Sequence, residues 1–229
     1  MRIAVASSLV LLFAAAGAAH ALELDPAVEL VVGTSHNLNG EDTHFLFDDS
    51  YMAGVRAMAF LGAPHDARWR FAGELALDAM HYDWLPRSAD GTDLDEWRFR
   101  LLVGGRVELR LSPRFTMFGR ALVGVDRYST DPLPYVPPGE PTGPMTLTLH
   151  GDALATELGL GVQATVGTFV VGLQCGLPIA FYTSGSKPSG GIVLNGGVEH
   201  PVADEALANL YAHRTVVDVE GLVTVGLAF

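Results

Sequence analysis

The last fifteen residues of the chain, 215–229, alternate between apolar and polar side chains and end on a phenylalanine. Successive side chains of a β-strand point to opposite faces, so this period predicts a strand with two different faces. The apolar face carries Val217, Val219, Val223, Val225, Leu227 and Phe229. The other face carries Asp218, Glu220 and Thr224. Such a strand fits a position between hydrocarbon on one side and polar groups on the other.

Seven further segments alternate in the same way. The eight predicted strands are approximately 27–33, 50–61, 68–83, 97–111, 115–127, 152–166, 168–183 and 215–229. Short and long connections follow one another along the chain, which predicts an antiparallel up-and-down meander with short turns at one end and long loops at the other. After the N-terminal region, no segment approaches the roughly 18 apolar residues that a spanning helix needs. A chain that crosses a membrane with strands must close into a barrel, because hydrocarbon leaves no partner for an open edge. The predicted fold is therefore all-β, a closed eight-stranded antiparallel transmembrane β-barrel.

The placement of charge supports this prediction, since Arg or Lys facing lipid at the bilayer midplane costs ~2–4 kcal/mol. Segment 97–111 has all its charged residues on one face and an apolar opposite face. Taken over all strands, the predicted lumen contains seven arginines and eight acids: Arg56, Arg70, Arg98, Arg100, Arg106, Arg110, Arg120, Glu29, Glu74, Asp78, Glu108, Asp126, Glu157, Asp218 and Glu220. Buried charges persist when they are paired, so we expect an ion-pair network in place of an open bore.

Antiparallel partners across a turn have a nearly constant index sum, which locates part of this network. Turns centred near residues 65, 90 and 113 place Arg56 opposite Glu74, Glu74 opposite Arg106, and Arg106 opposite Arg120. Glu157 on the next strand is the candidate acid between the two facing arginines. The predicted ion-pair site is Arg56, Glu74, Arg106, Arg120 and Glu157.

Residues 1–21 have the basic start, short apolar core and small-x-small ending of a secretory signal peptide. We expect a mature chain that begins at Leu22 and one barrel domain over residues 22–229. The formal net charge of −12 argues against nucleic acid as a partner. Cys175 is the only cysteine, so no intramolecular disulfide forms, and its neighbours Leu173 and Leu177 indicate a lipid-facing position.

The signal peptide, the alternating strands and the ending Gly221-Leu222-Val223-Thr224-Val225-Gly226-Leu227-Ala228-Phe229 resemble the small eight-stranded bacterial outer-membrane barrel family, which includes the transmembrane domain of outer-membrane protein A, the opacity proteins and porin-like domains. The resemblance implies a location in the outer membrane among lipid and lipopolysaccharide. It also implies a terminal strand read by the outer-membrane assembly machinery through Val223, Val225, Leu227 and Phe229, and no periplasmic binding domain. We expect a monomer.

The function class is less constrained than the fold. Eight strands leave an interior that side chains fill, so we expect a structural or surface-interaction role without catalysis, cofactor or metal. A narrow or gated pore for small solutes is one alternative. A lipid A-modifying hydrolase is another, with rim histidines His81, His150 and His213 near Ser88, Ser129 and Asp152. The acidic segment 90–96 lacks the glycine and distal glutamate of a calcium loop and is expected to be a solvated loop.

Three structural expectations complete the sequence analysis. Aromatic residues are predicted at both membrane interfaces. At the outer interface these are Tyr51, Tyr82, Trp84, Trp97 and Tyr182, and at the inner interface they are Phe60, Trp69, Phe115, Phe169 and Phe229. The proline-rich segment 132–144 is expected to lack a regular ladder, and the following long loop contains either a short helix at 203–213 or a hairpin over 191–200. The competing architecture is a soluble lipocalin-type barrel, which would reverse the two faces.

Overall fold

The computed structural model describes residues 25–38, 47–61, 67–84, 94–130, 133–135, 145–148, 150–181, 191–194, 198–201 and 215–228. Within these ranges the regular elements are all strands: β1 (Asp25–Asn37), β2 (Phe47–Phe60), β3 (Trp69–Trp84), β4 (Leu94–Arg110), β5 (Phe115–Thr130), β6 (Leu133–Tyr135), β7 (Met145–Thr148), β8 (His150–Val166), β9 (Phe169–Phe181), β10 (Gly191–Leu194), β11 (Val198–Pro201) and β12 (Thr215–Ala228). None of the described segments is a helix long and apolar enough to cross a membrane. The predicted signal peptide and the start at Leu22 lie outside the described residues.

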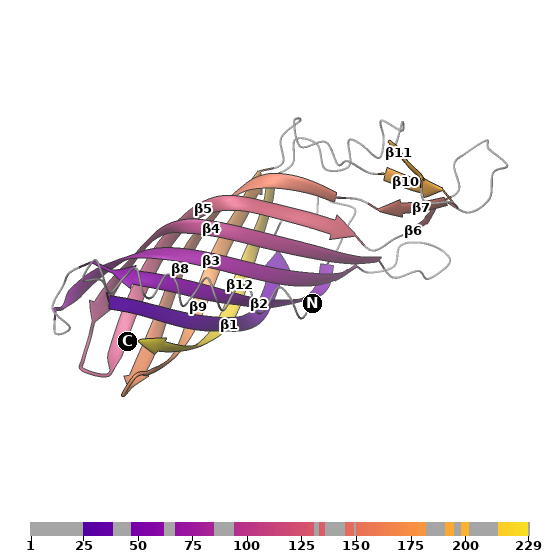
Figure 1. Ribbon diagram of the computed structural model, residues 1–229. Helices are drawn as coiled ribbons and strands as arrows, with labels where there is room; N and C mark the ends of the chain where they lie inside the picture. Colours follow the sequence, from indigo (N-terminus) through magenta and orange to yellow (C-terminus); the bar gives the residue numbers. More distant parts are fainter. Residues whose placement is uncertain are drawn as a thin grey trace.

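Eight of these strands close into a barrel in the order β1-β12-β9-β8-β5-β4-β3-β2 (Figure 1). Every neighbouring pair is antiparallel, and β12 closes the barrel against β1. The connection between β8 and β9 is a two-residue turn, in which Gly167 adopts φ +64°, a left-handed conformation that glycine accepts without a steric cost. The predicted closed, eight-stranded, up-and-down fold is confirmed.

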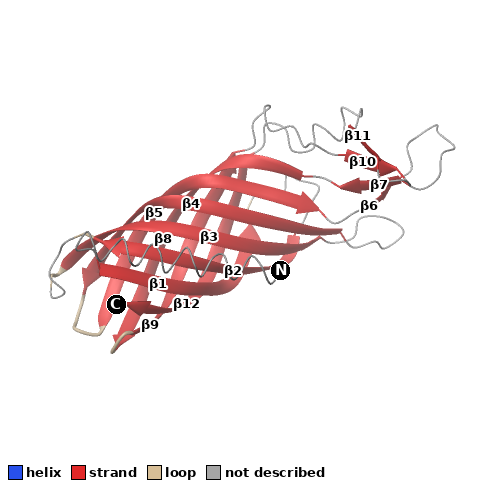
Figure 2. Cartoon of the chain, in the orientation of Figure 1, coloured by secondary structure: helices blue, strands red, loops and turns tan. Residues whose placement is uncertain are grey.

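The other four strands form a separate sheet in the order β11-β10-β7-β6, beyond one end of the barrel (Figure 2). We call this end the outer end, and the opposite end, with Asp25 and the short turns, the inner end. The expectation that segment 132–144 has no ladder is wrong at its start, because β6 pairs with β7. Pro134 is tolerated since β6 is an edge strand and needs no donor on its free side. For the next loop, β10 and β11 form the hairpin alternative, and residues 203–213 are not among those described.

The cross-strand register sets the stagger of the barrel. Partners followed once around the wall from Ala27 lead back to β1 at Asn37, a displacement of ten residues. A stagger of this size in eight strands corresponds to a strand tilt of about 40° and to an interior just wide enough for side chains.

Two of the three predicted pairings are wrong by two residues. Arg56 lies opposite Ala76, and Arg106 lies opposite Ala72, whereas the predicted pairing of Arg106 with Arg120 is confirmed. The centre of a turn cannot be read from the sequence when its loop is asymmetric. An error of two residues keeps every side chain on its face, because the strand period is two.

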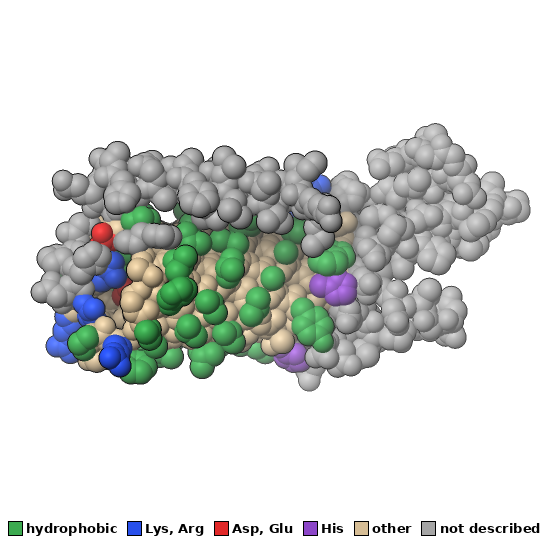
Figure 3. Space-filling model, turned by 60° about the horizontal axis from the view of Figure 1, so that its bottom comes forward, with side chains coloured by type: hydrophobic (Ala, Val, Ile, Leu, Met, Phe, Trp, Pro, Cys, Tyr) green, Lys and Arg blue, Asp and Glu red, His purple; other side chains and the backbone are tan. Residues whose placement is uncertain are grey.

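The two faces of the wall differ as predicted. Outside, the strands expose large apolar side chains, which cover the barrel wall in Figure 3. Inside, charged and polar side chains are buried, so the lipocalin alternative is excluded. Tyr51, Trp69, Trp97, Phe115 and Phe169 are exposed, as expected for interface aromatics.

Tyr82 and Phe60 correct the aromatic prediction, because both are buried in the lumen. Each shares its strand face with inward-facing charged residues, so alternation outweighs the preference of aromatics for the interface. The side chains of Trp84, Tyr182 and Phe229 lie outside the described residues.

Candidate functional site

The barrel interior is the part of the described protein richest in chemistry. Five arginines and nine acids are buried there: Arg56, Arg98, Arg100, Arg106, Arg120, Glu29, Glu74, Asp78, Glu96, Glu108, Asp126, Glu157, Asp218 and Glu220. Glu96 was missing from the predicted set, although it shares a strand face with Arg98. Arg70 and Arg110 are only half-buried, at the inner end. Apart from Glu96, the fourteen buried charges form three groups along the barrel axis.

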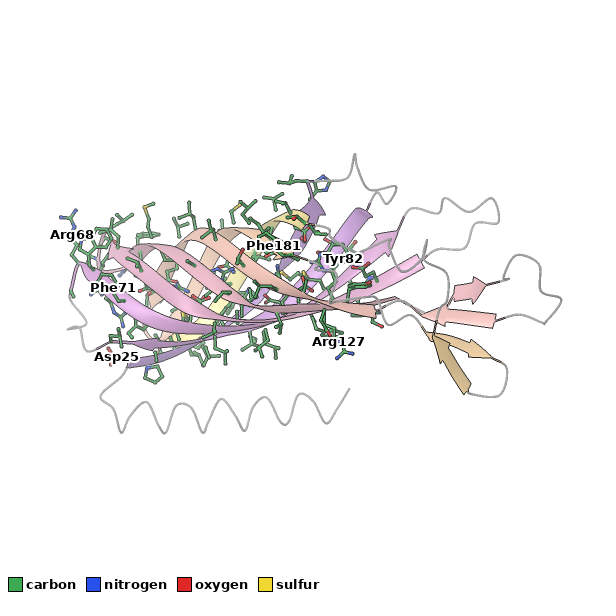
Figure 4. All side chains as sticks on the ribbon, turned by 90° about the horizontal axis from the view of Figure 1, so that it is seen from above. Asp25, Arg68, Phe71, Tyr82, Arg127 and Phe181 are labelled. Atoms are coloured by element: carbon green, nitrogen blue, oxygen red, sulfur yellow. The ribbon has the colours of Figure 1, made fainter. Side chains whose placement is uncertain are left out.

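The outer cluster is centred on Arg98. Its guanidinium donates to Asp218 Oδ2 at 2.9 Å and forms an ion pair with Asp126 on the neighbouring strand. Tyr82 lies against it, with 3.2 Å between Arg98 Nη1 and the phenol oxygen. Tyr82 lies near the outer end in Figure 4, with Asp25 at the other end. The cluster therefore links β3, β4, β5 and β12 across the lumen.

The middle group is a ring of seven charged side chains, which we call the lumen ring: Arg56, Glu74, Asp78, Arg100, Arg120, Glu157 and Glu220. All seven side chains are buried.

On the β2 and β3 side of the ring, Arg56 pairs with Asp78 and lies 3.7 Å from Glu74. Arg100 Nη2 lies 3.4 Å from Asp78 and also forms an ion pair with Glu220, so it joins these two acids.

Arg120 completes the contacts of the ring. Its Nη1 atom lies 3.2 Å from Glu74 Oε1, and its Nη2 atom donates to Glu157. An ideal Cβ at Gly159 would lie 2.6 Å from Arg120 Nε, so the Arg120 side chain runs along the lumen face of β8 where that strand has no side chain. The glycine is needed here for close approach.

The inner cluster is centred on Arg106. Its guanidinium contacts Glu29 at 3.2 Å and Glu108 at 3.0 Å, and it also donates to Gln163. The Cζ atom of Arg106 lies 3.7 Å from the centroid of the Phe118 aromatic ring, a cation–π contact. Arg106 thus has its own acids, at a different depth from the lumen ring.

The five predicted site residues are placed in two of these groups. Arg56, Glu74, Arg120 and Glu157 lie in the lumen ring, whereas Arg106 lies in the inner cluster, where its ion-pair partners are Glu29 and Glu108. Sequence reasoning did not include Asp78, Arg100 and Glu220 in the site. The alternation of the sequence did predict that these three side chains face the lumen. It could not predict the contact of Arg100 with Glu220, because that contact crosses the lumen between strands that are not neighbours.

A cavity of about 240 Å³ lies below the inner cluster, at the inner end of the lumen. Charged lining residues include Glu29, Arg70, Glu108 and Arg110. Arg70 lies 3.8 Å from Glu108 and 3.6 Å from Asp25. The lumen is therefore hollow below the inner cluster, while the ring above it is filled by side chains.

Four of the candidate hydrolase residues are described, and they lie on the outer part of the wall: His81, Ser129, His150 and Asp152. Ser129 on β5 is the cross-strand partner of His150 on β8, and Arg127 is the partner of Asp152. Asp152 is exposed and 3.7 Å from Arg127. His81 packs against Trp97, with ring centroids 4.6 Å apart. Ser88 and His213 lie outside the described residues.

Two further predicted features concern metal and the terminal strand. Among the described residues, no group of three or more His, Cys, Asp or Glu side chains could hold a metal ion, and segment 90–96 is only partly described. Val223, Val225 and Leu227 are exposed on the lipid face of β12, and Phe229 lies outside the described part.

An apolar exterior around a closed, ion-paired interior is the arrangement of a bacterial outer-membrane β-barrel protein, because a sheet satisfies all its backbone groups in hydrocarbon only when it closes. Comparison with solved structures agrees with this class. The chain is similar to a major outer membrane protein from Thermus thermophilus (TM-score 0.54, 14% identity, 89% of this chain and 99% of that one). It is also similar to the outer membrane protease OmpT from Escherichia coli (TM-score 0.50, 7% identity, 90% and 97%).

Neisserial surface protein A also aligns over 90% of this chain and 97% of its own, with 11% identity and a TM-score of 0.45. At these identities the likeness concerns the fold. No family model matches the sequence, and no curated protein is significantly similar to it. The protein is thus a small outer-membrane barrel located in the bacterial outer membrane.

Proposed function

We propose that the protein is a sealed outer-membrane barrel with a structural or surface-interaction role, without catalysis and without an open pore. The observation that carries this proposal is the lumen ring, whose seven buried side chains come from strands all around the wall. The outer cluster lies above the ring, and the inner cluster lies below it. A solute would have to separate several buried ion pairs to pass, and leaving one partner of such a pair uncompensated costs about 3–5 kcal/mol.

Single-channel recording on the refolded full-length protein tests this proposal. We expect no discrete conductance steps in planar bilayers at neutral pH. The cavity at the inner end favours the narrow or gated pore as the alternative, because the inner part of the lumen is already hollow. Steps seen in the wild type and lost after boiling would support the pore and contradict the sealed barrel.

A second candidate function is hydrolysis of lipid A acyl chains, favoured by the position of Ser129 opposite His150. A serine nucleophile needs a nearby histidine as base, and the outer part of the wall is where acyl chains of the outer leaflet lie. The acid that would orient the histidine is not assigned, since Asp152 pairs with Arg127. Mass spectrometry of lipid A from cells that express the wild type or Ser129→Ala separates the candidates. Loss of acyl chains with the wild type alone would establish the hydrolase.

The proposed partners are assigned to the lipid-facing wall, the outer end and the terminal strand of the barrel. Outer-membrane lipid contacts the apolar exterior, lipopolysaccharide surrounds the outer end, and the assembly machinery reads β12 through Val223, Val225, Leu227 and the terminal Phe229. We propose a monomer, with no nucleic acid partner because of the acidic net charge. Substitution of Leu227 and Phe229 by Ser should lower the amount of barrel in the outer membrane and leave refolding in detergent intact.

A further inference from the structure

The lumen ring contains more acids than arginines. Its contacts run in one order, in which acids and arginines alternate: Glu220, Arg100, Asp78, Arg56, Glu74, Arg120 and Glu157. Four carboxylates therefore face three guanidiniums. Each acid inside this order lies between two arginines, but the two acids at its ends have one arginine each.

The two end carboxylates meet above Gly176 on β9. An ideal Cβ at Gly176 would lie 3.1 Å from Glu157 Oε1 and 3.2 Å from Glu220 Oε2, so these two oxygens are within about 6 Å of each other. Glu220 Oε2 and Glu157 Oε2 are buried and have no hydrogen-bond partner in the described structure. Glu220 Oε2, which has no hydrogen-bond partner, therefore lies beside Glu157 Oε1, the oxygen that accepts from Arg120.

Within the described strands, no cation from outside the ring approaches this pair from the neighbouring wall. β9 lies between β8 and β12 and contains no charged residue. On β1, the partner of Glu220 is Ser35, and the two acids of that strand, Glu29 and Asp25, pair with Arg106 and Arg70. The next charge on β5, Asp126, is another acid and is paired with Arg98.

Two ionised carboxylates are disfavoured at this position, because each shares its arginine with another acid of the ring. Burial of excess negative charge is costly, and two carboxyl groups that share a site do not both ionise. We propose that Glu157 and Glu220 bind one proton between them, as a carboxyl–carboxylate pair that closes the lumen ring. One proton brings the ring to neutrality, whereas a divalent cation would make it positive. This inference concerns the chemistry of the ring and is independent of whether the barrel conducts.

Infrared spectroscopy of the full-length refolded protein at neutral pH tests the proposal. The wild type should show the carbonyl stretch of a buried protonated carboxyl group, which shifts in heavy water. Glu220→Gln and Glu157→Gln should each lose this band, because either change removes one partner of the shared proton. Glu29→Gln is the matched control and should keep it, since Glu29 lies outside the lumen ring and pairs with Arg106. A wild type without the band, or a band that survives in both pair variants, overturns the proposal.

Stability against pH gives a second readout that does not need the control variant to fold. Glutamate in the unfolded chain is ionised at neutral pH, so a folded state that holds one extra proton loses stability as pH rises. The folding equilibrium of the wild type should fall by up to about tenfold per pH unit above neutrality relative to Glu220→Gln. An equal pH dependence in both proteins contradicts the proton. A melting temperature that rises with potassium concentration in the wild type alone would assign the site to a metal cation and overturn it as well.

Discussion

Arg56 is the residue at which the energetic role of the lumen ring is tested most directly. It is fully buried, pairs with Asp78 and lies 3.7 Å from Glu74, so Arg56→Met leaves two acids without this cation. Removing one partner of a buried ion pair costs about 3–5 kcal/mol. Every 1.4 kcal/mol is a factor of ten, so the ratio of folded to unfolded protein should fall by roughly a hundred- to several thousandfold.

Reversible urea unfolding of the refolded barrel in lipid vesicles, followed by tryptophan fluorescence, measures this loss. With a slope of about 1–3 kcal/mol per molar urea, the unfolding midpoint should decrease by about 2 M. Arg127→Met is the control, because Arg127 and Asp152 form an exposed pair 3.7 Å apart. Exposed pairs contribute about 0–1 kcal/mol. Equal shifts in the two variants would refute the reasoning that burial makes these ion pairs costly to break.

Three further predictions concern the two faces of the wall. Leu160→Arg places a charge on the lipid face and should lower the free energy of unfolding in vesicles by about 2–4 kcal/mol, in the same urea assay; an unchanged midpoint would mean that this face does not contact hydrocarbon. Gly159→Leu fills the space occupied by Arg120, whose Nε atom would lie 2.6 Å from the new Cβ, and should lower stability by at least about 1–3 kcal/mol. A folded variant as stable as the wild type would show that Arg120 does not need that path. Cys175 is exposed on the lipid face, so a membrane-permeant maleimide should label it in vesicles much faster than a charged one; equal rates would place it in water.

The fold was largely predictable from local alternation. Charge on one side of each strand and apolar residues on the other were visible in the segment that became β4, because the strand period of two acts within a few residues. The same local information identified the lumen faces that carry Arg56, Glu74, Arg120 and Glu157. The prediction was wrong for Tyr82 and Phe60, because it followed the preference of aromatic residues for the interface and not the alternation along the strand.

Which side chains face lipid and which face the lumen follows from the sequence, since that choice depends only on the parity of position along a strand. Which charges touch depends on the tertiary structure. Arg106 joins Glu29 and not Glu74, and Arg100 reaches Glu220 across the lumen, because depth is set by the stagger of all eight strands. Small errors in turn length change that depth without changing the face, and contacts across the lumen join strands that no turn connects. The meeting of Glu157 and Glu220 above Gly176 belongs to this second kind of information.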